Sequence, residues 1–130
     1  LNWLHMSDAT LTFPQTLVLR YGRFEPAGRK QPQVVEDYSR WFLARLRAVE
    51  AAVANQEYLC ADRFTAADVA VGYALLLAEH LGLSPQFGEA TRMYWHRLQQ
   101  RPGYQRAMAA QLEAATAQGV PQTPAPDTQP

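Results

Sequence analysis

Residues 64–78 read FTAADVAVGYALLLA, and this stretch decides the fold class. Thr65 is placed to accept a hydrogen bond from the backbone N–H of Asp68, while the Asp68 carboxylate can reach back to the Thr65 N–H. The two residues form a capping box with Asp in the place usually taken by Glu or Gln. Phe64 and Val69 have the spacing of a hydrophobic staple. We therefore predict a helix start with a structural role for these four residues.

The helix that follows this start is apolar on nearly every side. Between Val69 and Ala78 almost no polar residue interrupts the run. A helix of this kind is usually enclosed by its neighbours, and Gly82 supplies a stop signal. We predict a buried helix over residues 65–81.

Helical periodicity dominates the rest of the chain as well. A long helix is expected over about 32–55, with the apolar stripe Val35, Tyr38, Phe42, Leu46, Val49 and Val53. Further helices are expected over about 89–100 and from Pro102 to about Ala117. The first segment, about 1–21, holds Pro14, so a kink or break is expected near Thr12 and Phe13. A polar loop over 22–33 and a disordered Pro-rich tail over 118–130 complete the outline. The prediction is an all-α domain, an orthogonal or up-and-down bundle of about five helices over residues 1–117.

Composition limits the classes of function. The chain has 130 residues, 48% of them hydrophobic, with 12 Lys and Arg against 12 Asp and Glu, which fits one domain. Formal neutrality argues against a broad nucleic-acid or anionic-lipid surface. No apolar stretch is long enough to cross a bilayer, and the histidines and single cysteine have no metal-ligand spacing. We expect a cytoplasmic protein with no metal, no nucleic acid and no membrane as partner.

The ordered motifs of residues 1 to about 115 resemble the C-terminal helical domain of a bacterial glutathione transferase. The resemblance is carried by Trp3-Leu4-His5, by Tyr58-Leu59-Cys60-Ala61-Asp62-Arg63 leading into the capping box, by Tyr94-Trp95-His96-Arg97-Leu98, and by Arg101-Pro102-Gly103-Tyr104. In that family the Ser, Tyr or Cys that activates the glutathione thiol lies in an N-terminal thioredoxin-like domain. These 130 residues show no βαβ pattern of that kind, so we predict no catalytic residue here. The chain is expected to be a fragment, and inactive by itself.

The resemblance implies roles for the first helix, which in the family lines the pocket for a small hydrophobic electrophile and contributes to a homodimer. By position, the candidate substrate-binding residues are His5, Asp8, Leu11, Thr12, Phe13, Arg20 and Tyr21. The Asp8 carboxylate is a candidate partner for the ammonium of glutathione, the expected co-substrate; no tightly bound cofactor is expected. If this helix packs on another domain, Trp3, Leu4, Phe13 and Leu17 should form an exposed apolar patch that promotes self-association.

Ordinary structural interpretations stand beside these roles. His5 among apolar neighbours is commonly a packed residue, a surface Asp such as Asp8 is commonly only solvated, and Cys60 lacks a neighbour that would activate it. Family members usually carry Gly where this chain has Ala61, so a positive φ there would strain the turn. An isomerase or lyase is equally compatible with the scaffold. The alternative function is a non-catalytic helical domain for protein–protein interaction.

Overall fold

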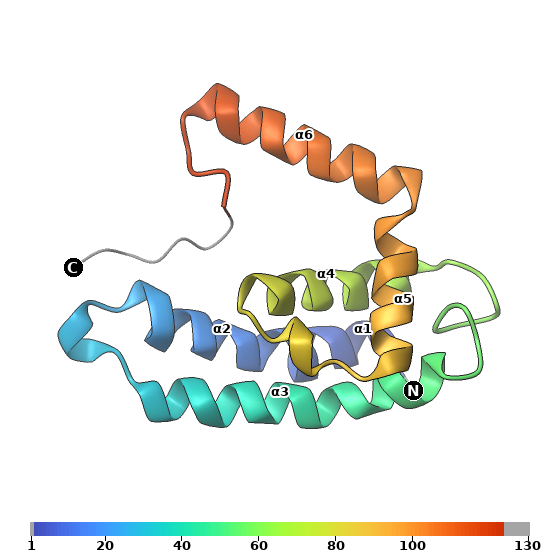
Figure 1. Ribbon diagram of the computed structural model, residues 1–130, viewed down its shortest axis with the longest axis horizontal. Coiled ribbons are helices and arrows are strands. Elements are labelled where there is room, and N and C mark those ends of the chain that lie inside the picture. Colours follow the sequence, from blue (N-terminus) through green and yellow to red (C-terminus); the bar gives the residue numbers. More distant parts are fainter. Residues whose placement is uncertain (1, 124–130) are drawn as a thin grey trace.

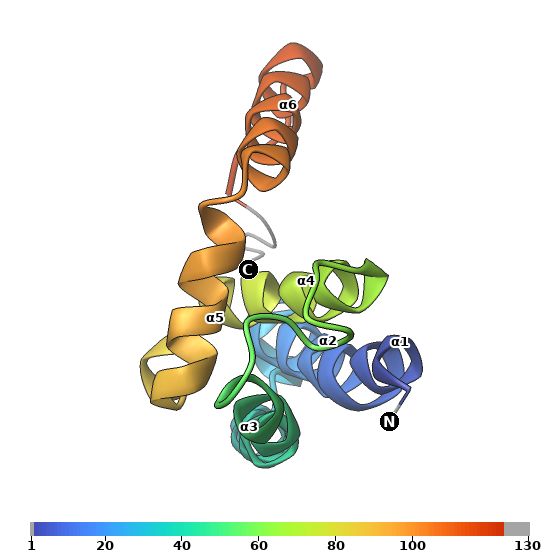
Figure 2. The same ribbon diagram turned by 90° about the vertical axis from the view of Figure 1, so that its right-hand side faces the viewer.

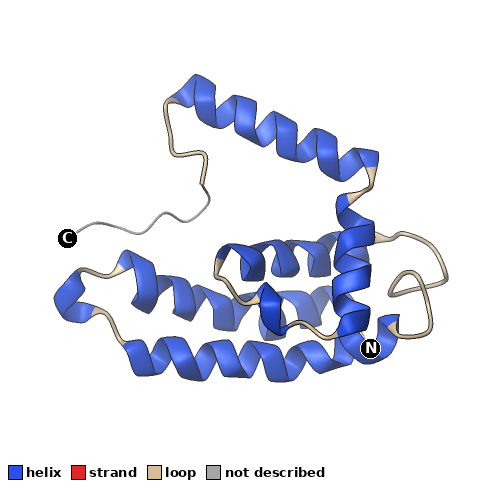
Figure 3. Ribbon diagram, in the orientation of Figure 1, coloured by secondary structure: helices blue, strands red, loops and turns tan. Residues whose placement is uncertain are grey.

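Six α-helices, joined by π-helical and 3-10 turns, make up the secondary structure of residues 2–123, the part of the chain that the computed structural model describes (Figures 1 and 3). They are α1 (Trp3–Met6), α2 (Phe13–Leu19), α3 (Pro32–Val53), α4 (Ala66–His80), α5 (Glu89–Gln99) and α6 (Pro102–Gln118). No strand occurs over these residues, so the all-α prediction is confirmed. Of the predicted tail over 118–130, residues 124–130 lie outside the described residues, and Gln118 still belongs to α6.

The first helical segment runs without a gap from Trp3 to Phe24. A π-helical turn over Ser7–Thr12 joins α1 to α2, and a second over Arg20–Phe24 extends α2. The break predicted near Thr12 and Phe13 takes the form of the first π-helical turn, and the helix continues through Pro14. The predicted loop over 22–33 is also shorter than expected, since it begins after Phe24 and contains a 3-10 turn over Ala27–Arg29.

The π-helical turns change the periodicity of this segment. Two turns of α-helix take about seven residues, and a π-helical turn takes up an additional residue. Burial accordingly repeats every eight residues. Two stripes are buried or half-buried throughout, namely Trp3, Leu11 and Leu19, and Ser7, Gln15 and Arg23. The stripes that contain exposed positions are Leu4, Thr12 and Arg20; His5, Phe13 and Tyr21; and Asp8, Thr16 and Phe24, of which only Thr12 and Tyr21 are half-buried.

One of the buried stripes fastens the first segment to α4 by side-chain hydrogen bonds. The Ser7 hydroxyl donates to the Ala70 carbonyl at 2.8 Å, and the Gln15 amide donates to the Ala74 carbonyl at 3.0 Å. Arg23 donates to the His80 carbonyl at 2.6 Å. These donors are eight residues apart in sequence and meet α4 in chain order. The backbone of residues 3–12 packs closely on α4, whereas residues 13–24 pack mainly on α3.

The core forms where α3, α4 and α5 meet the first segment, as Figure 1 shows. α3 contributes Phe42, Leu46, Val49 and Val53, all on the stripe predicted for this helix. α4 ends at its predicted stop: Gly82 has φ +75°, and the Leu83 N–H donates to the Ala78 carbonyl at 2.9 Å. This bond satisfies a carbonyl that the helix leaves free at its C-terminus.

The prediction that α4 is enclosed on every side is wrong. Val69 is 59% exposed and Tyr73 is 58% exposed. The reason is the course of α6, which leaves the end of α5 and extends away from the body instead of packing on α4 (Figure 2). α6 has no buried residue. One side of α4 therefore faces an open groove.

Candidate functional site

The first segment carries the residues predicted to line a substrate pocket. His5, Asp8, Phe13 and Arg20 are exposed, and Thr12 and Tyr21 are half-buried. The eight-residue repeat places Thr12 and Arg20 on one stripe, and His5, Phe13 and Tyr21 on the stripe beside it. Leu11 differs, because it has no exposed surface and lies in the core cluster, so it cannot form part of an open wall in this chain.

Two of the candidates have defined side-chain environments at the N-terminal end of the segment. The His5 backbone N–H donates to the Asn2 side-chain oxygen at 3.3 Å, and the ring nitrogen Nδ1 of His5 lies 3.2 Å from the Asn2 side-chain nitrogen. Asp8 is exposed and makes no ion pair with the rest of residues 2–123. Its carboxylate is therefore available to a cationic group from outside the described chain.

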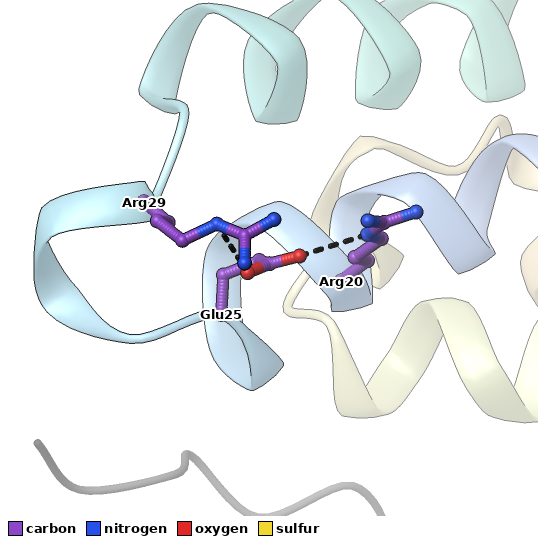
Figure 4. A network of polar contacts seen from close by, with 3 residues as sticks. All are labelled: Arg20, Glu25 and Arg29. Carbon is purple, nitrogen blue, oxygen red and sulfur yellow. Dashed lines mark hydrogen bonds and ion pairs between the residues drawn. The ribbon is translucent and has the colours of Figure 1, made fainter.

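At the other end of the segment, Arg20 and Arg29 converge on Glu25 (Figure 4). The Arg20 Nε lies 2.9 Å from Glu25 Oε1, and the Arg29 Nε lies 3.2 Å from Oε2. The hydrogen bond to Glu25 raises the pKa of Arg20, and the neighbouring Tyr21 acts in the same direction. Glu25 is largely buried, whereas the Arg20 side chain is 54% exposed, so part of its guanidinium remains in contact with solvent.

Tyr21 lines a hollow between the first segment and α3. The hollow has a volume of about 420 Å³, and its other walls are Leu17, Gln31, Val34 and Tyr38. The Arg20 guanidinium lies 5.1 Å from the centre of the Tyr21 ring. Tyr21 is thus a residue of the predicted wall that borders a concave surface.

Asp68 is the most fully engaged polar residue of the capping region. It is 1% exposed. Oδ2 accepts from the Thr65 N–H at 2.8 Å and from its hydroxyl at 3.2 Å, and Oδ1 accepts from the Leu59 N–H at 3.0 Å and the Tyr94 hydroxyl at 2.9 Å. The Thr65 hydroxyl oxygen accepts from the Ala67 N–H at 3.3 Å, and the whole forms a capping box.

The contacts of Asp68 with Leu59 and Tyr94 were not predicted from the sequence. They join the loop before α4 and the middle of α5 to the first turn of α4. Burial and the Asp68 carboxylate raise the pKa of Tyr94, which keeps the hydroxyl protonated as a donor. With every oxygen of Asp68 occupied, its chemistry is structural. The predicted staple between Phe64 and Val69 stays a prediction: Phe64 packs edge-on against Tyr58, with ring centres 6.0 Å apart.

The loop before the capping box contains the strained turn expected at Ala61. Ala61 has φ +54° and Asp62 has φ +50°, and the Arg63 N–H donates to the Cys60 carbonyl at 3.2 Å. Two successive positive φ values define a type I′ turn, which favours Gly and Asn. Ala61 thus occupies a conformation in which the Cβ atom is unfavourable. Cys60 is half-buried and free.

The groove between α4, α5 and α6 is a site that sequence reasoning missed. It has a volume of about 430 Å³ and is lined mainly by apolar side chains, among them Phe64, Val69, Tyr73, Trp95, Tyr104 and Met108, with Arg101 at its margin. The available signal was the apolar stripe Tyr104, Met108 and Ala115 on α6, of which Tyr104 packs against Trp95. Periodicity identifies such a stripe, but it does not indicate the direction of the helix relative to the rest of the bundle.

Within residues 2–123 no three His, Cys, Asp or Glu side chains are grouped so that they could hold a metal ion. None of the helices there combines the length and apolar character needed to span a membrane.

A family model and a solved structure both match this chain. The model of the "Glutathione S-transferase, C-terminal domain" family matches residues 9–102. Among solved structures, the glutathione transferase URE2P8 from Phanerochaete chrysosporium, crystallised with oxidized glutathione, has a TM-score of 0.75 at 18% sequence identity. The match covers 88% of this chain and 52% of that one, so the chain spans about half the length of its structural relative. No curated protein matches. Because the family model covers most of the chain, this protein belongs to the glutathione S-transferase C-terminal domain family.

Proposed function

We propose that this chain acts as the C-terminal domain of a glutathione transferase that conjugates glutathione to small hydrophobic electrophiles. The family match carries this proposal. The reaction needs a glutathione thiolate as nucleophile, and thiolate formation needs a neighbouring hydrogen-bond donor or base. In the proposed arrangement a thioredoxin-like domain supplies that donor and most contacts to glutathione. The helical chain supplies the apolar wall for the electrophile and a surface for a homodimer.

The exposed face of the first segment supports the role as a wall and an interface. Leu4 is 47% exposed and Phe13 is 56% exposed, and they lie on adjacent stripes of one face. Trp3 packs partly against the core, and Leu17 lines the hollow beside Tyr21, so the patch is narrower than predicted. Large apolar side chains held in solvent by a rigid helix are typical of surfaces that another molecule or domain covers.

Polar residues on the same face fit the proposed substrates. Asp8 offers an unpaired carboxylate for the ammonium of glutathione, and such a charge-assisted hydrogen bond is favourable. Arg20 is held by Glu25 and presents a fixed cation at the far end of the face. Phe13 and Thr12 lie between the two charges, where an apolar electrophile would rest.

Sedimentation velocity tests whether this face is an interface. The chain should self-associate reversibly as its concentration rises, and Phe13→Asp should shift the equilibrium to monomer, because it places a charge in the centre of the contact. Met93→Asp is the matched control, since Met93 on α5 is 59% exposed but lies outside this face. A chain that is monomeric at every concentration, or an equal response to both variants, would contradict the proposed interface.

A further inference from the structure

The groove between α4, α5 and α6 has the composition of a small-molecule site. Its volume of about 430 Å³ lies within the range of roughly 300–1,000 Å³ found for ligand pockets. Gly72 and Leu98 are among its lining residues, and most of the others are aromatic or aliphatic. Trp95 and Tyr104 pack edge-to-face in the wall, with ring centres 5.6 Å apart. Burial raises the pKa of Tyr104, so the wall stays uncharged.

One cation stands at the margin of this apolar surface. The Arg101 guanidinium carbon lies 3.7 Å from the centre of the Phe64 ring, and its Nη1 donates to the Tyr58 hydroxyl at 3.0 Å. These two contacts fix the plane of the guanidinium before any ligand arrives. Arg101 makes no ion pair with another side chain of residues 2–123. Its remaining N–H donors are therefore available to an anion at the groove.

Among the lining residues that the structure describes, Asp68 is the one carboxylate, and it does not neutralise Arg101. Asp68 reaches the groove wall, but its oxygens already accept four hydrogen bonds from Thr65, Leu59 and Tyr94. The groove thus combines an apolar body with one uncompensated positive charge at its margin. A ligand of complementary chemistry has an apolar chain or ring and a single carboxylate.

We propose that the groove between α4, α5 and α6 binds monocarboxylates with an extended apolar body, with the carboxylate on Arg101 and the body against Trp95 and Met108. An Arg guanidinium binds a carboxylate through two parallel N–H donors. Because Arg101 is already stacked on Phe64, it loses less conformational entropy when it adopts this geometry. The site uses none of the candidate residues of the first segment. It is therefore independent of the proposed transferase role, and either proposal can fail without the other.

Titration of the chain with decanoate tests the site, with decan-1-ol as the neutral counterpart. Calorimetry gives the affinity, and NMR chemical-shift changes locate the ligand. Decanoate should bind in the micromolar range and perturb the indole resonance of Trp95. Arg101→Gln should weaken decanoate binding about tenfold, which corresponds to the loss of one charge-assisted contact, and should leave decan-1-ol binding unchanged.

Two variants on α6 separate binding in the groove from binding elsewhere. Met108→Glu places a negative charge on the lining and should abolish decanoate binding. Leu112→Glu makes the same chemical change one turn further along α6, at a residue outside the lining, and should have no effect. Neither residue is buried, so both variants should fold. Equal affinity for decanoate and decan-1-ol, an Arg101→Gln variant that binds like the parent, equal responses of the two α6 variants, or no decanoate binding would each overturn the proposal.

Discussion

A single carboxylate organises the most specific motif of this chain. Asp68 begins as a capping residue that can be inferred from its distance to Thr65 in sequence. In the folded chain it also accepts from Leu59 and from Tyr94, which is 26 residues away. A buried carboxylate is tolerated only when hydrogen bonds replace its hydration, and four donors do so here. The residue therefore joins three parts of the fold.

Replacement of Asp68 should be among the most destabilising single changes. Asp68→Ala leaves the Leu59 N–H, the Thr65 N–H and the Tyr94 hydroxyl without their acceptor, so the free energy of unfolding should fall by about 3 kcal/mol. Urea unfolding monitored by circular dichroism measures this. Asp8→Ala, an exposed Asp on the first segment, should change stability by less than about 0.5 kcal/mol. An Asp68→Ala chain as stable as the parent would contradict the structural role.

Ala61 offers a change in the opposite direction. Because its φ is +54°, Ala61→Gly removes an unfavourable Cβ contact and should raise the free energy of unfolding by about 1 kcal/mol. Ala51→Gly is the matched control: Ala51 is exposed within α3, where Gly should lower stability by about 1 kcal/mol. If both substitutions destabilise the chain in urea titrations, the left-handed turn is not formed in solution.

At the scale of elements, α5 begins with a cap supplied by another helix. Gly88 at the N-cap has no side chain to accept from the first turn. The Glu50 carboxylate on α3 does so instead, accepting from the Ala90 N–H at 3.1 Å and the Thr91 N–H at 2.8 Å. A Cβ atom at position 88 would collide with this carboxylate, so the contact with Glu50 favours Gly there. The contact joins α3 to α5 and also places a negative charge at the positive end of α5.

The Glu50 cap should appear in the pH dependence of stability. Burial by itself would raise the pKa of Glu50, but the hydrogen bonds from Thr91 and Ala90 outweigh it and leave the pKa below its usual value. The cap therefore contributes its full stabilisation above the pKa that Glu50 has in the unfolded chain. This contribution is lost as the pH falls through the lower pKa that Glu50 has in the folded chain.

Glu50→Gln should consequently reduce the loss of stability between neutral and acid pH. The measurement is urea unfolding from pH 7 to about pH 3, a range that spans the usual pKa of Glu. Glu36→Gln is the control, because Glu36 is exposed and its ion pair is with Arg40 on its own helix. A Glu50→Gln profile that parallels the parent profile would show that the carboxylate does not cap α5.

The elements with strong local signals were predictable and the others were not. The capping box, the stripe of α3 and the stop at Gly82 depend on neighbours in sequence, so the positions of α3 to α6 followed from periodicity. The π-helical turns of the first segment did not, because Pro14 signals a disturbance without saying how the backbone absorbs it. The exposure of Val69 and Tyr73 depends on the direction of α6, which local sequence does not encode. The candidate wall was therefore placed only by resemblance, and the groove at Arg101 was missed.

At the scale of the whole molecule, the described residues form a helical body with one unpacked helix and one exposed apolar face. The chain spans 52% of the length of its structural relative, a glutathione transferase crystallised with oxidized glutathione. The proposed function divides the chemistry between two domains: the helical one holds the electrophile, and a thioredoxin-like one activates the thiol. On this division, the contact that this chain offers to glutathione is the exposed Asp8 carboxylate, which is weak by itself.

Calorimetric titration of the chain with reduced glutathione tests this division of labour most directly. One exposed charge contact contributes little in water, so no saturable binding tighter than millimolar should appear. Asp8→Asn should behave like the parent within error. Saturable binding at micromolar concentrations would contradict the account, because it would show that the helical domain holds glutathione without a thioredoxin-like domain.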